Sequence, residues 1–572
     1  MAIVGILFVA LGLYAWKLAA SAIQVKDSVT SAVGQTEKIM SAVAAGDLPG
    51  ADTQMKSVEK NLAAAESGIE GWEWGGVAWV PPVGDNIHAI RTAVETAQWL
   101  VGEVARPAIP LITDGLRPKA GKFDVAAIRE LSEVLSTAAP RFEHRQRDLA
   151  AAAEGELIGP VADGVGKLES LLGQAEPVVH DSVGLLQILP ATLGGNGPRD
   201  YLLMFQGTSE ARSLGGNPAV LLQIHVEDGS ISIGGFANSS DFHSRANPVI
   251  PLDPEAEHIF GDKIGRWFPD VTMPPDFPYS VELVRAFWNE TVGTEVDGVL
   301  SIDPTLLSYI LEATGPVPLS TGDVLTSGNA VPLLLNEVYF RYEDPMAQNA
   351  FFAEAAGGVF TALTTGAGNP LGLVTALQRG SEEGRLLYAP TNADEAALID
   401  GTRASGSMPL DNIDETAVGV FVNDNTGSKK SYYLNMTVDI SSKACAAGSE
   451  GEAYSGSVSL TSTLSPEVAA TLPYYITGPY FGPRVISTYI ALYGPLGGEL
   501  SNVLIDGVPA KVLSQGTHLG RPVVKVEVLN DGLSRHHVDF DFSLPTPEGG
   551  PISVWHTPMT GDTPVVIKDE CR

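Results

Sequence analysis

Five residues suited to anion binding lie close together, between two apolar segments at residues 201–205 and 219–224. They are Glu210, Arg212, Gly215, Gly216 and Asn217. The apolar segments have strand character, so we expect a polar loop that joins two strands. Glycines and an arginine at such a loop aim backbone N–H groups and a guanidinium fork at one point, which suits a carboxylate or a phosphate. The sequence therefore predicts a site in which Glu210, Gly215, Gly216 and Asn217 bind substrate and Arg212 is catalytic.

A second polar segment follows the strand expected at residues 230–236 and contains Asp241 and Arg245. If neighbouring strands pair, both segments emerge at related positions and their charges converge. Arg212 and Arg245 would then clamp a pyrophosphate, and Asp241 would serve as a base or as a ligand of Mg²⁺, the one cofactor the sequence indicates. The alternative is structural: Arg212 pairs with Glu210 or Asp241 and fixes the loops in place.

The chain divides into three regions in which apolar residues recur at different spacings, and the elements of these regions must position the candidate site residues. Apolar stripes at helical spacing, such as Met55, Val58 and Leu62, predict a helical bundle or stalk over residues 26–195. Strands alternating with helices predict an α/β domain over residues 196–425. Strict alternation, as in residues 432–440, predicts a β-sandwich of immunoglobulin-like size over residues 426–572.

The first residues form an apolar segment interrupted only by Lys17, and we expect residues 1–25 to be an uncleaved transmembrane anchor. A cleaved signal peptide and a buried soluble helix are the alternatives. Two cysteines, Cys445 and Cys571, follow far downstream. An even pair beyond a membrane segment predicts an extracytoplasmic disulfide, against the alternative of two unrelated thiols.

The charge balance is strongly acidic, with 68 Asp and Glu against 35 Lys and Arg and a formal net charge of −33. Such a surface repels other polyanions, so no nucleic-acid partner is expected. Any polyanionic ligand needs local arginines or a bridging cation.

Several motifs carry a family resemblance: YLLMFQGTSEARSLGG at residues 201–216, VDGVLSID at 296–303, EATGPV at 312–317 and VNDNTGSKK at 422–430. With them, the chain resembles the bacterial "domain of unknown function 4012" family of envelope proteins, for which no reaction is established. The region 196–425 also resembles, more weakly, the LytR-CpsA-Psr phosphotransferases, which move glycopolymers from lipid pyrophosphate carriers with arginines, an aspartate and Mg²⁺. That family's arginine and aspartate positions would fall at Gly215, Gly216 and Asn217 and near Asn238, so the charges do not coincide.

Together these features predict a single-pass membrane protein, largely extracytoplasmic, that acts in cell-envelope assembly. Its expected ligand is an envelope glycopolymer or a polyprenyl-pyrophosphate lipid, which it binds and as an enzyme would transfer. The alternative is a non-catalytic envelope scaffold that engages partner proteins through the bundle and the sandwich. A soluble cytosolic enzyme is the third reading, and it requires the first twenty residues to be buried in a core.

Overall fold

The structure is a computed structural model that describes residues 47–69, 81–444, 452–544 and 549–570, together with residues 35, 38, 39 and 42. It divides into two compact units. The first, the helical unit, comprises residues 1–195 with residues 369–371. The second, the sheet unit, comprises residues 196–368 and 372–572.

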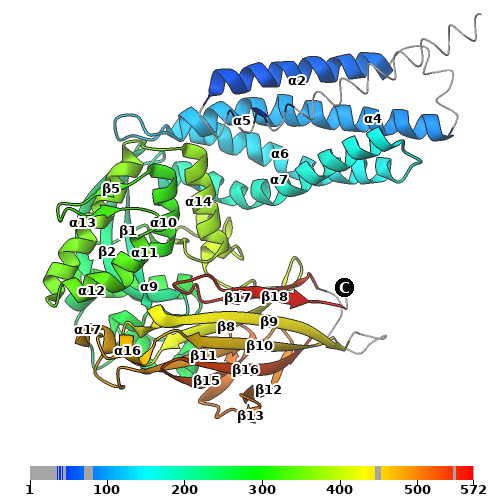
Figure 1. Ribbon diagram of the computed structural model, residues 1–572. Helices are drawn as coiled ribbons and strands as arrows, with labels where there is room; N and C mark the ends of the chain where they lie inside the picture. The colour runs from blue at the N-terminus through cyan, green and yellow to red at the C-terminus, as the bar shows by residue number, and fades with distance from the viewer. Residues whose placement is uncertain are drawn as a thin grey trace, which may run out of the picture. The chain divides into compact units, whose positions relative to one another are not determined.

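In its described residues, the helical unit is made mainly of helices (Figure 1). Met55, Val58, Leu62 and Ala65 are buried along one face of the first described helix, as the predicted stripe requires. A later helix begins where the Asp124 carboxylate accepts a hydrogen bond from the Ala127 N–H at 3.1 Å, an N-cap. The helices are α2 (Leu48–Ile69), α4 (Pro81–Trp99), the π-helix η1 (Leu100–Ala105), α5 (Arg106–Pro110), the π-helix η2 (Leu111–Gly115), α6 (Val125–Ala153) and α7 (Gly159–Thr192).

A five-stranded sheet forms one part of the sheet unit, with the strand order β3-β2-β1-β4-β7. The strands are β1 (Arg199–Arg212), β2 (Gly215–Glu227), β3 (Ser230–Asn238), β4 (Gly298–Ile302) and β7 (Leu387–Pro390). Only β1 and β4 run parallel, and the other neighbours are antiparallel. This sheet is therefore mixed, and its first three strands form a meander.

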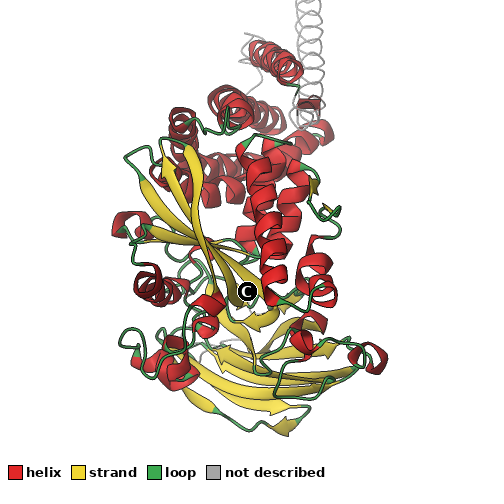
Figure 2. Ribbon diagram, turned by 90° about the vertical axis from the view of Figure 1, so that its left-hand side faces the viewer, coloured by secondary structure: helices red, strands yellow, loops and turns green. Residues whose placement is uncertain are grey.

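Helices cover both faces of this sheet (Figure 2). Side chains alternate along β1, so Leu203 and Phe205 pack towards α10 (Pro304–Thr314) and α13 (Pro345–Thr364), whereas Leu202 and Met204 pack towards α9 (Phe277–Val292). The remaining helical segments of this part are η3 (Ser239–Asp241), α8 (Pro254–Phe260), η4 (Asp262–Gly265), η5 (Phe268–Asp270), α11 (Ala330–Pro332), the π-helix η6 (Leu333–Glu337), α12 (Val338–Arg341), α14 (Pro370–Glu382), α15 (Ala393–Ala397) and η7 (Arg403–Ser405). A small ribbon of β5 (Val317–Pro318) and β6 (Val324–Leu325) lies between α10 and α11 in the sequence.

The other part of the sheet unit is a β-sandwich whose sheets have, in the described residues, six strands (β13-β12-β16-β10-β9-β18) and five strands (β14-β15-β11-β8-β17). The predicted inward positions Leu434, Met436, Val438 and Ile440 are all buried between the two sheets. The strands and helical turns are β8 (Thr416–Asp424), η8 (Lys430–Tyr433), β9 (Leu434–Ala444), β10 (Ala453–Ser462), α16 (Pro466–Ala469), α17 (Tyr474–Thr477), β11 (Val485–Tyr493), β12 (Glu499–Ile505), β13 (Val508–Pro509), β14 (Ser514–His518), β15 (Arg521–Asp531), β16 (Ser534–Ser543), β17 (Ile552–His556) and β18 (Val565–Lys568).

The fold class predicted from the sequence is wrong as a whole, although the C-terminal region is rich in strands as expected. The immunoglobulin-like description fails because β17 runs parallel to β8 and β18 parallel to β9, whereas the immunoglobulin sandwich is antiparallel. The α/β region and the sandwich belong to one compact unit.

The chain was also expected to contain a transmembrane helix. Within the residues that the structure describes, no helix is both long enough and apolar enough to cross a bilayer. The anchor expected at residues 1–25 lies outside the described residues, and so do Cys445 and Cys571 with their expected disulfide.

Candidate functional site

The polar loop expected after residue 205 is absent: β1 continues to Arg212 and β2 starts at Gly215. Arg212 pairs with Gly215 across a turn of two residues, so the predicted loop is the end of a long hairpin. Gly216 allows the two strands to approach, because a Cβ atom there would lie 2.3 Å from the Gly207 carbonyl oxygen. The glycines expected to expose N–H groups to a ligand thus serve the strand pairing.

The tip of this hairpin is bound to the sandwich. Ser213 donates its N–H to the Asn423 side-chain oxygen at 3.1 Å, and the Asn423 amide donates back to the Ser213 hydroxyl at 3.0 Å. The Thr557 hydroxyl donates to the Ser213 carbonyl oxygen at 3.0 Å. These buried contacts connect the five-stranded sheet to β8 and to the residue after β17.

Arg212 lies in a buried ion-pair network, with only 4% of its side chain exposed. Its Nη2 donates to Asp270 at 2.8 Å and to Glu210 at 2.9 Å. Lys429 contacts the other oxygen of Glu210 at 2.8 Å, and Lys263 contacts Asp270 at 2.9 Å. The structural alternative for Arg212 is therefore the one observed, with Asp270 as a partner that the sequence did not indicate.

The ion pairs shift the pKa values of this network. Burial alone would raise the pKa of Glu210, but Lys429 and Arg212 outweigh it and lower that pKa to about 2. Burial alone would lower the pKa of Arg212, but Asp270 and Glu210 outweigh it and raise that pKa. Both side chains are therefore charged at neutral pH and are satisfied mainly by each other and by neighbouring charges.

Asp241 and Arg245 have different partners. The Asp241 carboxylate accepts the N–H of Asn238 at 2.8 Å in a capping box, and Arg245 pairs with Glu290. In the described part of the chain, no contact joins Arg212 to Asp241 or Arg245. The end of β3 pairs with β2 at Val220, before the hairpin extension begins, which explains the separation.

Asn217 and the metal site expected at Asp241 are the remaining features predicted from the sequence. Asn217 is buried, and its side-chain oxygen has no hydrogen-bond partner among the described residues. No group of three or more His, Cys, Asp and Glu side chains that could hold a metal ion, around Asp241 or elsewhere, occurs within the described residues.

A cavity of about 60 Å³ lies between β1 and β2 on one side and the helices α10, η6 and α13 on the other. We call it the sheet–helix cavity. Its walls are mainly apolar and include Val220, Leu307, Leu334, Leu335, Ala355 and Ala356. Two residues with polar groups, Gln206 and Tyr339, also line it. The Gln206 amide is already used, because it donates to Ser301 at 2.7 Å and accepts the Gly216 N–H at 2.9 Å.

This cavity was not predicted from the sequence, because its lining residues are apolar and small residues of an ordinary kind. One local signal accompanies it: Leu334 and Leu335 belong to the π-helix η6. Such wide turns are rare and are frequent at functional sites. From the sequence, this segment was expected only to be part of the α/β domain over residues 196–425.

These features define a protein with a helical unit and a sheet unit, in which a mixed sheet is bound to a β-sandwich and borders an apolar cavity. Residues 196–339 match the family described as "protein of unknown function (DUF4012)". The match starts before β1 and ends within α12, and it confirms that part of the predicted resemblance. The resemblance to LytR-CpsA-Psr phosphotransferases is not shown by the comparisons. No curated protein matches the chain.

Proposed function

We propose that this protein binds the hydrocarbon end of a lipid-linked cell-envelope intermediate in the sheet–helix cavity, as a binding protein. The observation that carries the proposal is the apolar wall of that cavity, formed by side chains of β2, α10, η6 and α13. The sequence motifs that resemble the "domain of unknown function 4012" family of envelope proteins support the choice of a cell-envelope lipid as the ligand.

Hydrophobic burial supplies the affinity. Each methylene group transferred from water to such a wall contributes about 0.8 kcal/mol. Because the Gln206 amide already has hydrogen-bond partners, an apolar chain leaves no amide unsatisfied on entering. The mainly apolar lining favours isoprenoid or acyl groups over sugars.

The size of the cavity limits what it holds. A single water needs roughly 10–15 Å³ of cavity volume. The sheet–helix cavity, with about 60 Å³, therefore accommodates a few carbon atoms. The structure therefore fits the terminal isoprene or acyl carbons of a longer chain. The π-helix η6 supplies Leu334 and Leu335 at this point.

The ion pairs and hydrogen bonds of the predicted catalytic residues favour a binding protein over an enzyme that transfers a phosphoryl group. Arg212, Asp241 and Arg245 each have other protein partners, so a phosphoryl group would have to displace Glu210, Asp270 or Glu290 to reach the arginines. The ion pairs at Arg212 are buried, and breaking such pairs is costly.

The test is the affinity of the full chain for farnesol, a fifteen-carbon isoprenoid alcohol, measured by isothermal titration calorimetry. Ala356 lines the cavity, and Ala356→Met adds apolar atoms to α13 that fill it. We expect this variant to weaken farnesol binding at least about tenfold, since it removes space for roughly two methylene groups. Ala353→Met, the same change on the same helix at a position that does not line the cavity, is the control and should bind as the wild type does. Equal affinity in both variants would refute the proposal.

A second candidate function, an envelope scaffold, is favoured by exposed aromatic side chains near η8. Tyr474 and Tyr480 are 74% and 78% exposed, and Tyr475 stacks on Tyr339 with 5.4 Å between ring centroids. Exposed tyrosines are common at protein interfaces. This candidate predicts that a partner protein isolated from bacterial envelopes is lost on Tyr474→Ser and Tyr480→Ser but retained on Ala356→Met.

A further inference from the structure

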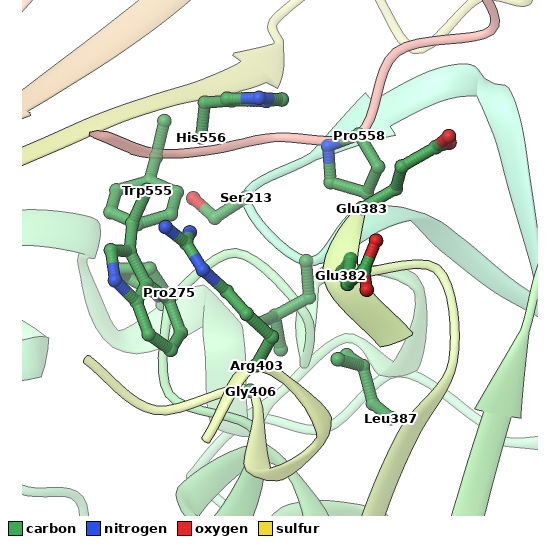
Figure 3. A pocket seen from close by; sticks show the side chains of 13 residues that line it. Ser213, Pro275, Glu382, Glu383, Leu387, Arg403, Gly406, Trp555, His556 and Pro558 are labelled. Atoms are coloured by element: carbon green, nitrogen blue, oxygen red, sulfur yellow. The ribbon is translucent and has the colours of Figure 1, made fainter. Parts of the chain in front are cut away.

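A second cavity, of about 40 Å³, lies within the sheet unit where the central sheet meets the sandwich (Figure 3). We call it the arginine cavity. Arg403 from η7, Ser213 from the hairpin tip, Trp555 from β17 and His556 from the same strand line it. Its volume is about three times the roughly 10–15 Å³ that one water needs, so it has room for a small polar group.

Arg403 has few partners for a half-buried arginine. Its Cζ lies 4.1 Å from the centroid of the Trp555 ring, and its Nη2 donates one hydrogen bond, to the Val554 carbonyl oxygen at 3.1 Å. Among the described residues, no carboxylate lies within ion-pair distance of it. A guanidinium has five N–H donors, so most of those of Arg403 remain available to a ligand.

Other buried arginines of the sheet unit have more partners than Arg403, although the Nε atoms of Arg212 and Arg521 have none among the described residues. Arg385 contacts Asp303 at 2.7 Å and Glu383 at 2.5 Å, and Arg212 has its two carboxylates. Arg521 has no carboxylate partner among the described residues but donates to the carbonyl oxygens of Ala417, Gly494 and Pro409. Arg403 alone in this comparison combines a cavity, a missing counter-ion and unused donors.

The neighbouring charges leave the cation of Arg403 uncompensated. Glu383 lines the cavity but is occupied by Arg379, Arg385 and the Tyr309 hydroxyl. Glu382 at the rim is exposed and accepts a hydrogen bond from Gln378 at 2.9 Å. Burial lowers the pKa of Arg403 to about 10, with Glu415 opposing, which is the direction expected for a cation in need of an anion.

His556 also lines the cavity, next to Trp555 in β17. Its Nδ1 lies 3.0 Å from the Thr557 carbonyl oxygen, so Nδ1 carries the proton and Nε2 keeps its lone pair. Burial lowers the pKa of His556 to about 4, with Arg403 and Arg385 adding to the effect, so the ring is neutral at pH 7.

From this geometry we infer that the arginine cavity binds a small oxyanion, a phosphate or a carboxylate group, through the free donors of Arg403. The arginine cavity is separate from the sheet–helix cavity. If no anion binds in the arginine cavity, the proposal that a hydrocarbon chain binds in the sheet–helix cavity is unaffected. Either group fits, because its charged oxygens match the guanidinium.

The test uses the full chain and titrates inorganic phosphate and acetate separately by calorimetry. We expect Arg403→Met, which keeps an apolar stem against Trp555, to weaken binding at least tenfold. Arg379→Met is the matched control: Arg379 also stacks on an aromatic ring, 3.8 Å from the Tyr309 centroid, but it is paired with Glu383. It should bind as tightly as the wild type.

A second measurement does not depend on the folding of a variant. Selenate soaked into wild-type crystals should be found by its anomalous signal within hydrogen-bond distance of Arg403. Binding of phosphate alone identifies a phosphate site, and binding of acetate as well identifies a general oxyanion site. The inference is overturned if neither anion binds at 10 mM (~100 times the expected range of a specific site), if Arg403→Met binds equally well, or if selenate lies elsewhere.

Discussion

At the residue scale, the chemistry-bearing side chains near the hairpin tip hold the protein together. Arg212 is buried between Asp270 and Glu210, so its removal leaves two carboxylates short of a counter-ion. Breaking a buried pair in this way costs about 3–5 kcal/mol. We therefore predict that Arg212→Met lowers the free energy of unfolding by that amount in urea denaturation.

Arg245→Met is the control for this prediction. Arg245 is paired with Glu290 at a more exposed position, where an ion pair is worth about 1 kcal/mol or less. If both variants lose less than about 1 kcal/mol, the network around Arg212 is not structural, and the anion-clamp interpretation of Arg212 regains its basis.

A buried histidine makes the sheet unit sensitive to acid. His518 is 1% exposed, and its Nδ1 lies 2.7 Å from the Tyr493 hydroxyl. Burial lowers its pKa to about 4, against the partial opposition of Asp253, whereas in the unfolded chain it titrates near 6.5. Between these values the unfolded state binds more protons, so stability falls as the pH drops from about 6.5 to about 4.

We predict that His518→Gln removes on the order of 3 kcal/mol of this pH dependence, because glutamine does not titrate there. Urea denaturation of both proteins at pH 7 and pH 4 measures it. An unchanged difference between the two pH values would show that His518 is not the responsible group.

At the element scale, the β1–β2 hairpin depends on a glycine without space for a side chain. We predict that Gly216→Ala destabilises the protein by at least about 2 kcal/mol, since its Cβ would meet the Gly207 backbone. Gly357→Ala in α13 is the control: no atom lies within 4 Å of its Cβ position, and alanine favours a helix by about 1 kcal/mol. Thermal unfolding of both variants decides, and a stabilising Gly216→Ala would contradict the hairpin geometry.

Elements were predictable where one face of them is buried and the other is polar. The alternation at Leu434, Met436 and Val438 indicated a strand correctly, because water lies on one side of it. The same reasoning failed at residues 206–217, where polar residues were interpreted as a loop. Both sides of that hairpin are covered, and its polar side chains are satisfied by groups such as Asn423 and Asp270, which are far away in the sequence.

At the scale of the whole molecule, the central sheet and the sandwich share their buried polar contacts. Ser213, Asn423 and Thr557 connect them through buried hydrogen bonds. We predict that residues 196–572 fold when expressed alone and unfold in one cooperative transition, whereas residues 196–425 alone stay unfolded. Circular dichroism of both fragments measures this, and a folded 196–425 fragment would show that the sandwich is dispensable.

The contacts between residues far apart in the chain could not be predicted from the sequence. Charge and period identify separate segments, but neither says that Arg212 will meet Asp270 or that Glu210 will meet Lys429. The expected convergence of Arg212 with Asp241 and Arg245 depended on the length of the hairpin. Beyond the Val220–Asn238 pair it extends through residues 215–219 of β2 and the turn residues 213 and 214. The sheet–helix cavity could not be predicted because no polar motif in the sequence marks its lining residues.

The central claim is that an apolar chain occupies the sheet–helix cavity. The most direct test is a crystal structure of the protein with farnesol. The account predicts electron density for isoprene carbons between Val220 on the sheet and Leu335 on η6. Density only at the exposed tyrosines, or no bound farnesol at saturating concentration, would contradict it.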